Sequence, residues 1–193
     1  MGMKKNIKEH IINTAGELFY TKGFNRTGIN QIIDACDIAK ATLYHHFKSK
    51  DAICIAYLKH KHDSFMQGLS EFVKERQESK HQLLAIFDYL RELYRTGELK
   101  GDWGQKIMSE ITPEDTEIWN TVQQQKKELL FFLGEIVGRT VAHVSKAEVE
   151  KISGTIYLLY ESAITETYIH ENDWPIHLAR TMAPVALQDV KLL

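Results

Sequence analysis

The sequence predicts an all-α protein in two parts: a helix-turn-helix domain over residues 1–48 and a larger helical domain over residues 49–193. Two short helical segments with a tight turn between them occupy residues 23–51. Along the rest of the chain, apolar residues recur at intervals of three and four, which is the spacing of one face of a helix. No stretch of the sequence has the alternating pattern of a β-strand. These observations together predict about nine helices.

The N-terminal domain is expected to contain three helices. The first covers residues 4–21 and has one apolar stripe, made of Ile7, Ile11, Ala15, Leu18 and Phe19. The second follows Thr27, whose side chain is expected to cap it, and runs to about residue 36. The third covers residues 40–46, with Leu43 and Phe47 turned inward. Two short helices, the second with a polar outer face, form the helix-turn-helix pattern, whose second helix fits a DNA major groove.

Capping signals mark the helices of the C-terminal domain. The predicted helices cover residues 49–75, 81–96, 103–110, 112–143 and 146–170, and a last one begins near residue 174. Ser49 is expected to cap the first of these, and Thr112-Pro113-Glu114 to begin the fourth. Ser145 and Glu148 have the spacing of a capping box. Pro184 is expected to kink or end the last helix.

Residues 5–60 resemble the TetR family of bacterial transcriptional regulators. The shared segments are Leu18-Phe19, Lys22-Gly23-Phe24, Thr27-Gly28-Ile29, Lys40-Ala41-Thr42-Leu43-Tyr44, His46-Phe47 and Lys50-Asp51. These segments are spread over several helical turns, so the resemblance is more specific than a helix-turn-helix alone. The rest of the chain is similar to the family only in length and helical character. The resemblance implies a DNA-binding N-terminal domain and a C-terminal domain for ligand binding and dimerisation.

Two residues at the predicted turn depart from the family pattern. Asp37 stands where the family commonly has glycine, at a position that favours a positive φ angle. Aspartate adopts that conformation more readily than most residues, so we expect the turn to form at some cost. Ala39 stands where the family often has serine, and alanine cannot cap a helix. The third helix is therefore expected to begin with less local support.

The resemblance implies that the third helix reads DNA. Lys40 has the length and charge to bond a guanine or a phosphate, and Ala41 is small enough to let the helix approach a thymine methyl. Thr42 can bond a base edge or a phosphate. Phosphate contacts, which set the register of the protein on DNA, are expected from Tyr44, His45, Lys50, Asn30 and Thr27. For Thr27, a purely capping role is an equally good interpretation.

Charge is distributed unevenly along the sequence. Residues 1–50 hold eight lysines and arginines against four aspartates and glutamates, whereas the rest holds 16 against 22. A basic N-terminal domain suits a polyanionic partner, although an excess of four charges is also ordinary surface variation. No signal peptide and no apolar run of membrane-spanning length is apparent, so a cytoplasmic protein is expected.

No pattern of catalytic or metal-binding residues is apparent, so neither an enzyme nor a cofactor or metal site is expected. Glu161, Glu166 and His170 share one predicted helix, but Glu161 and His170 are nine residues apart and lie on opposite faces. The two cysteines, Cys36 and Cys54, have no disulfide or metal-binding spacing. Both are expected to be small buried thiols.

The resemblance implies a ligand pocket between the helices of the C-terminal domain. We expect a small, partly apolar or aromatic effector whose binding releases the protein from DNA. The candidate pocket residues are Phe65, Phe87, Tyr94, Trp103, Met108, Trp119, Tyr157 and Tyr160, although each is more commonly a core residue. In some relatives a cysteine follows the glycine that corresponds to Gly101. This chain has Asp102 there, so thiol sensing at this position is not expected.

By resemblance, the last two helices, residues 145–170 and 175–190, form a four-helix interface in a homodimer. Such a dimer would act as a repressor and read a palindromic operator in double-stranded DNA. Helix 146–170 has a second apolar face that suits a core or a subunit contact, and we expect Tyr160 and Ala163 to lie at the interface. The alternative is an all-α ligand-binding or protein-binding adaptor without sequence-specific DNA binding.

Overall fold

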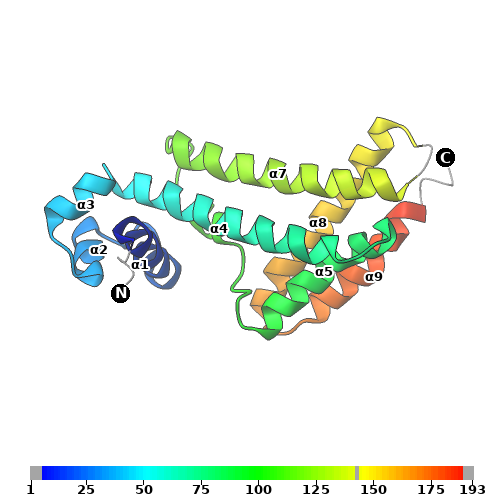
Figure 1. Ribbon diagram of the computed structural model, residues 1–193, viewed down its shortest axis with the longest axis horizontal. Helices are drawn as coiled ribbons and strands as arrows, with labels where there is room; N and C mark the ends of the chain where they lie inside the picture. Colours follow the sequence, from blue (N-terminus) through cyan, green and yellow to red (C-terminus); the bar gives the residue numbers. More distant parts are fainter. Residues whose placement is uncertain (1–5, 142–143, 189–193) are drawn as a thin grey trace. The chain divides into compact units, whose positions relative to one another are not determined.

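The computed structural model describes residues 6–141 and 144–188. These residues form nine α-helices and no strand, so the predicted fold class is confirmed (Figure 1). The helices are α1 (Ile7–Lys22), α2 (Ile29–Cys36), α3 (Lys40–His46), α4 (Lys50–Lys74), α5 (Ser79–Arg95), α6 (Trp103–Met108), α7 (Thr116–Thr140), α8 (Lys146–His170) and α9 (Trp174–Gln188). None of the helices in the described part of the chain has the length and apolar character that a membrane span requires.

The chain divides into two compact units. The first unit comprises Met1–Ser64 and Trp103–Gln125, and the second comprises Phe65–Asp102 and Lys126–Leu193. Helices α4 and α7 each continue from one unit into the other. Compactness therefore groups the N-terminal helices with α6 and the start of α7. The functional boundary expected at residues 48–49 stays a prediction.

The first unit is built around one apolar core that joins the N-terminal helices to α6 and α7. Helix α1 begins after Asn6, whose side chain accepts the N–H of Glu9, and ends at Gly23 with a φ angle of 94°. Its inner face packs closely on α4, since a Cβ at Gly16 would lie 2.4 Å from the ring of Tyr57. The fully buried members of this core are Ile11, Ala15, Phe19, Ile32, Leu43, Ile53, Cys54 and Leu58. The short helices α2 and α3 are thereby held by side chains from longer ones.

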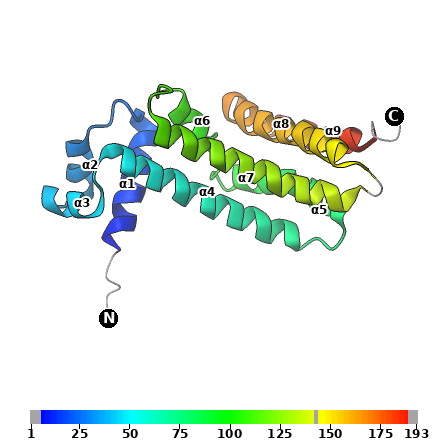
Figure 2. The same cartoon turned by 90° about the horizontal axis from the view of Figure 1, so that it is seen from above.

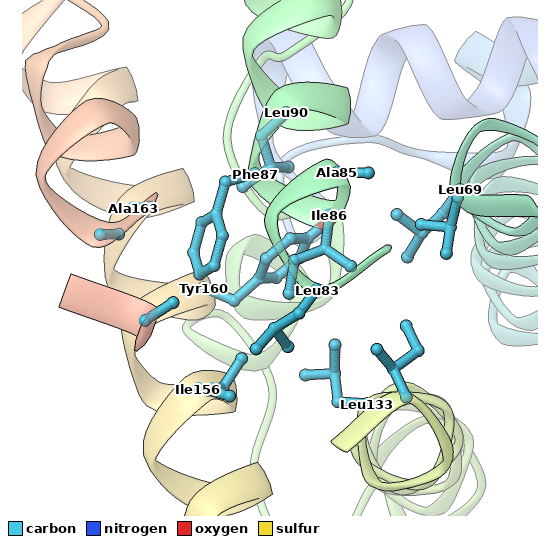
Figure 3. Packing of buried hydrophobic residues seen from close by; sticks show 14 of the residues in the cluster. Leu69, Leu83, Ala85, Ile86, Phe87, Leu90, Leu133, Ile156, Tyr160 and Ala163 are labelled. Atoms are coloured by element: carbon cyan, nitrogen blue, oxygen red, sulfur yellow. The ribbon is translucent and has the colours of Figure 1, made fainter. Parts of the chain in front are cut away.

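The second unit has a separate core centred on an aromatic group. The ring of Tyr160 on α8 lies among Phe87 and Ile86 of α5 (Figure 3), and its centroid is 5.8 Å from that of Phe87. Leu69 and Leu133 line the same core from α4 and α7. Helices α8 and α9 lie side by side in both views (Figures 1 and 2), and α9 also packs on α5. The unit is a helical bundle whose last two helices are neighbours.

Several predicted helix ends are confirmed. Helices α3 and α8 have the predicted bounds, and Ser49 accepts the N–H of Ala52 at the start of α4. The capping box at the start of α8 is present, because the side chains of Ser145 and Glu148 each accept the other residue's backbone N–H. The predicted end of α7 at residue 143 lies outside the described residues, as do residues 4 and 5 of the first predicted helix.

Two predictions about helix ends are wrong, and one of the two alternatives for Pro184 is excluded. Gly28, not Thr27, is the N-cap of α2, because the Thr27 hydroxyl donates to the carbonyl of Gly23 instead. Helix α7 begins at Thr116, because the carboxylate of Asp115 accepts the N–H of Thr112 and closes a turn before the helix. Pro184 does not end α9, which continues to Gln188.

Candidate functional site

The turn between α2 and α3 has the unusual backbone that its sequence predicts. Asp37 ends α2 in the left-handed conformation, with φ 53° and ψ 49°. Its N–H donates to the carbonyls of Asp34 and Ile33, which satisfies the end of the helix. Ala39 then begins α3 as an N-cap without a side-chain hydrogen bond, as expected. The turn is therefore made by backbone contacts and by the burial of α3.

Helix α3 presents a polar face to solvent. Leu43 is fully buried and Phe47 nearly so, and these two side chains anchor the helix on the unit's core. The face turned away from that core carries the exposed residues Lys40, Ala41, Tyr44 and His45, together with the partly exposed Thr42. The Lys40 ammonium lies 5.9 Å from the centroid of the Tyr44 ring. Asn30 is exposed on α2.

Two predicted DNA-contact residues have structural partners inside the first unit. The Thr27 side chain is fully buried, so its hydroxyl has no access to a phosphate, and we remove it from the candidate contacts. Lys50 donates from its ammonium to the carbonyl of Phe24 over 2.9 Å and lies 4.1 Å from the centroid of the Phe24 ring. Lys50 therefore fixes the connection between α1 and α2 in this structure.

Helix α6 and Glu110, two residues after its end, hold the last turn of α1 and the connection from α1 to α2. The Lys106 ammonium donates to the carbonyl of Tyr20 over 2.5 Å and lies 4.0 Å from the centroid of the Tyr20 ring. The Asn25 N–H donates to the Glu110 carboxylate over 2.9 Å, and the Asn25 amide donates to the Glu110 carbonyl. We call these contacts of Lys106 and Glu110 the α6 clamp. Sequence reasoning missed them, because partners 85 residues apart leave no local signal.

Gly23 fits beside the α6 clamp because it lacks a side chain. Its φ angle is 94°, a conformation that residues with a Cβ rarely adopt. A Cβ at this position would also lie 2.8 Å from an oxygen of the Glu110 carboxylate. Glycine at the end of α1 thus permits the positive φ angle and leaves space for the Glu110 carboxylate.

The eight predicted pocket residues divide between the two units. Trp103, Met108 and Trp119 belong to the first unit; Phe65, Phe87, Tyr94, Tyr157 and Tyr160 belong to the second. In the second unit, Phe65 and Phe87 contact the Tyr160 ring, with centroids 6.5 and 5.8 Å away. Tyr94 is instead tied to the α8–α9 connection, because its hydroxyl donates to the carbonyl of Glu171.

Tyr160 carries a buried polar group in an apolar setting. Its side chain is fully buried, and in the described part of the chain its hydroxyl has no hydrogen-bond partner. Burial, reinforced by the charge of Glu161 nearby, holds the pKa of Tyr160 well above its ordinary value. The hydroxyl is therefore a neutral donor and acceptor in the middle of the aromatic core, and it is the most ligand-like polar group among the predicted pocket residues.

The second unit also contains a partly buried ionic cluster. The Lys126 ammonium on α7 lies 2.5 Å from a carboxylate oxygen of Asp102, before α6, and 2.5 Å from one of Glu161, on α8. The side chains of Asp102 and Glu161 are 9% and 11% exposed. Burial alone would lower the pKa of Lys126, but the two carboxylates raise it, so the lysine is charged at neutral pH. We call these three residues the Lys126 cluster; sequence reasoning did not find it.

Neither cysteine has the setting of a reactive thiol. Cys36 and Cys54 are both buried, as expected. Burial, with the charge of Asp51 as the next contribution, raises the pKa of Cys54 to about 12. Reactivity requires the thiolate, so Cys54 is inert at neutral pH. Among the described residues, no group of histidine, cysteine, aspartate and glutamate side chains could hold a metal ion.

Comparisons with known proteins agree with this arrangement. Residues 11–57 match the family model described as bacterial regulatory proteins, tetR family. The HTH-type transcriptional repressor NemR of Escherichia coli K12 is 24% identical over 106 residues, which are 54% of this chain and 53% of NemR. In several such alignments the chain spans about half the length of the curated relative that it matches.

Solved structures match over nearly the whole chain. SCO4454, a TetR-family transcriptional regulator from Streptomyces coelicolor, superposes with a TM-score of 0.82 at 18% identity and covers 95% of each chain. The reduced form of E. coli NemR gives a TM-score of 0.79 at 18% identity, covering 92% of this chain and 95% of NemR. At these identities the likeness is one of fold.

The nine described helices and the N-terminal motif define an all-α protein of the helix-turn-helix class. The matched segment contains α2 and α3 whole, with most of α1 and the start of α4. Over residues 11–57 the chain matches the TetR family of bacterial regulatory proteins, and over nearly its whole length it has the fold of solved TetR-family structures.

Proposed function

We propose that the protein is a homodimeric, ligand-responsive repressor that binds a palindromic operator in double-stranded DNA through α3. The observation that carries this proposal is the polar face of α3. Its apolar residues Leu43 and Phe47 are buried, whereas Lys40, Ala41, Tyr44 and His45 point to solvent. A helix of seven residues anchored in this way fits a major groove with its outer face toward the bases. The place of action would be the cytoplasm.

The proposed contacts divide into base contacts and positioning contacts. Lys40, Ala41 and Thr42 form the first turn of α3 and are assigned to base edges. Tyr44, His45 and Asn30 are assigned to phosphates, which set register without reading sequence. Lys50 holds the Phe24 carbonyl, so its contribution to DNA binding would come mainly from keeping α2 in place.

The proposed dimer interface is the exposed apolar surface of α8 and α9. On α9, Trp174, Leu178, Met182 and Val185 form one exposed stripe at helical spacing. On α8, Leu158 and Ile169 are 67% and 62% exposed. Tyr160 and Ala163, which were expected at the interface, are instead buried in the chain's own core. Of the predicted range 175–190, residues 189–190 lie outside the described part of the chain.

The proposed effector site lies in the second unit, around the Tyr160 hydroxyl. Phe65, Phe87 and Tyr160 supply aromatic surface, and the hydroxyl supplies a polar group that a ligand can bond. We propose a small, partly aromatic effector with one hydrogen-bonding group. Its binding would release DNA only if it binds the DNA-free state more tightly than the DNA-bound state.

Selection of DNA from a random pool tests the proposal. The purified protein, at near-physiological salt, is expected to recover a palindrome with half-sites one helical turn, or a multiple, apart. Lys40→Ala is expected to alter the preferred base at one position of each half-site, at a cost of about 1–3 kcal/mol for the original operator.

Lys59→Ala is the matched control, because Lys59 is an exposed lysine on α4 outside α3. It should leave the preferred sequence unchanged. Binding to all DNA without any selected motif would contradict the proposal and favour the adaptor without sequence-specific binding. A palindrome whose base preferences do not respond to Lys40→Ala would retain the regulator but remove Lys40 from base reading.

A further inference from the structure

The Lys126 cluster stands where the chain passes between the two units. Asp102 is the last residue of its segment in the second unit, and the next residue, Trp103, begins α6 in the first unit. Lys126 is the first residue of the second unit on α7, directly after Gln125 of the first. The ion pair between Lys126 and Asp102 therefore joins two of the three places at which the chain crosses. Glu161 fixes the same ammonium to α8.

The backbone before Asp102 is shaped to bring its carboxylate to Lys126. Gly101 has a φ angle of 79°, and a Cβ there would lie 3.2 Å from the ring of Tyr168 on α8. The loop thus lies against α8 immediately before the ion pair. Asp102 has little freedom to leave Lys126 while this contact stands, because the side chain is short and 9% exposed.

The crossing at Asp102 leads directly into the α6 clamp. Four residues after Asp102, Lys106 holds the carbonyl of Tyr20, and eight residues after it, Glu110 holds the N–H of Asn25. The segment 20–25 comprises the end of α1 and the start of the connection to α2. Asp102 is thus linked to this connection through the peptide chain of α6 and the contacts of the α6 clamp.

We propose that the Lys126 cluster is a positioning device for DNA binding. Lys126 fixes the start of α6 through Asp102, and α6 fixes the helix-turn-helix through the clamp. An event in the second unit that separates Lys126 from Asp102 would free α6 and weaken operator binding. The DNA part of this inference rests on the proposed function; the effect on the clamp does not.

Two variants that each remove one carboxylate from the Lys126 cluster isolate the link to α6. Asp102→Ala leaves Lys126 paired with Glu161, and Glu161→Ala leaves it paired with Asp102. Each variant removes one carboxylate and keeps one ion pair, so neither leaves the lysine alone in a buried site. Only Asp102→Ala cuts the connection to the chain that enters α6.

Hydrogen exchange in the full-length protein tests the effect without DNA. The Asn25 amide and the amides of α6 should exchange about 2- to 30-fold faster in Asp102→Ala, because a coupling of this kind changes local equilibria by that factor. The core amides of Ile53 and Leu58 serve as an internal reference for global stability. Glu161→Ala should leave the clamp amides unchanged relative to this reference.

Operator affinity provides the second readout. With the operator selected by the unmodified protein, Asp102→Ala should weaken binding about 2- to 30-fold, and Glu161→Ala should change it less. Glu110→Gln, which weakens the clamp, should have a similar effect. The double variant of Asp102 and Glu110 should bind the operator about as weakly as either single variant. The two effects should not add, because both residues position α6 through the same chain of contacts.

Three results would overturn the inference. The first is equal exchange of the clamp amides in Asp102→Ala and the unmodified protein. The second is an equal change in Glu161→Ala, which would make the cluster a contribution to stability only. The third is an additive double variant. If no operator is selected, the proposed function fails, and the exchange measurement still decides whether Asp102 positions α6.

Discussion

At the scale of single residues, the turn between α2 and α3 forms with little help from side chains. Asp37 adopts a left-handed conformation that glycine adopts at lower cost, and Ala39 leaves the first N–H groups of α3 without a cap. The helix with the proposed base contacts is thus held mainly by Leu43 and Phe47. A residue at the N-cap position is therefore expected to change stability without touching the core.

Ala39→Ser should stabilise the protein by about 1 kcal/mol, because serine at an N-cap accepts a backbone N–H that alanine leaves unsatisfied. The backbone of Ala39, with φ −67° and ψ 145°, already has the extended conformation of an N-cap. Denaturant unfolding measures the change. Ala41→Ser is the control: the same substitution inside α3 should lower stability by a few tenths of a kcal/mol. Equal effects of the two serines would mean that Ala39 is not the functional N-cap.

The hydroxyl of Tyr160 is a buried polar group without a hydrogen-bond partner in the described part of the chain, and such a group lowers stability. Tyr160→Phe should raise the free energy of unfolding by about 1 kcal/mol, because an unpartnered buried hydroxyl costs about 1–3 kcal/mol. Tyr157→Phe, at a partly exposed site on the same helix, should change it by less than about 0.5 kcal/mol. Thermal and denaturant unfolding check both. A loss of stability in Tyr160→Phe would mean that a bound water satisfies the hydroxyl, and its role as a ligand-facing group would lose its support.

At the scale of helices, the sequence predicts best the elements whose ends are set by neighbouring residues. Helix α8 was bounded correctly because the Ser145–Glu148 box acts over three residues, and α3 because Leu43 and Phe47 anchor a short segment. The start of α7 was missed because Asp115 competes for the N–H of Thr112, which leaves Thr112-Pro113-Glu114 in a turn. The helical type of each element follows from periodicity. The start of α7 depends instead on whether the Thr112 or the Asp115 side chain forms the local hydrogen bonds.

The continuation of α9 through Pro184 shows tertiary packing overriding a local rule. Proline removes one helical hydrogen bond and usually bends or ends a helix. In α9, however, Ile176, Ala179 and Ala183 before the proline are buried in the core of the second unit, and Ala186 and Leu187 after it pack against the same core. The burial of these residues offsets the lost bond. A kink at Pro184 stays a prediction.

The candidate site was predictable from the sequence only in part. The polar face of α3 could be predicted, because a helix-turn-helix places its outer residues by local spacing. The α6 clamp and the Lys126 cluster could not, since Asn25 meets Glu110 and Lys126 meets Glu161 across 85 and 35 residues. Thr27 was misassigned for the same reason: its burial depends on packing that periodicity does not reveal.

At the scale of the whole molecule, two exposed apolar helix faces make a strong prediction about assembly. A double variant, Leu158→Arg and Leu178→Arg, should convert the proposed dimer to a monomer or raise its Kd at least about 30-fold, as loss of a central interface contact of about 2 kcal/mol would do. Sedimentation over a concentration series measures this. Phe131→Arg is the control, because Phe131 is 71% exposed on α7, outside the proposed interface. A dimer that survives the double variant but not Phe131→Arg would move the interface to α7.

Helix α4 continues without a break through residues 64 and 65, where the two units meet along the chain. This continuity restricts where insertions and deletions can be tolerated. Adding one residue within a continuous helix turns everything beyond it by about 100° and moves it by about 1.5 Å. An insertion of that kind in α4 would rotate the downstream residues away from their partners on both sides of the insertion. The connection between α4 and α5, at residues 75–78, has no such constraint. Insertions can therefore be tolerated in this connection, whereas the number of residues in α4 is as restricted as the identity of its apolar residues.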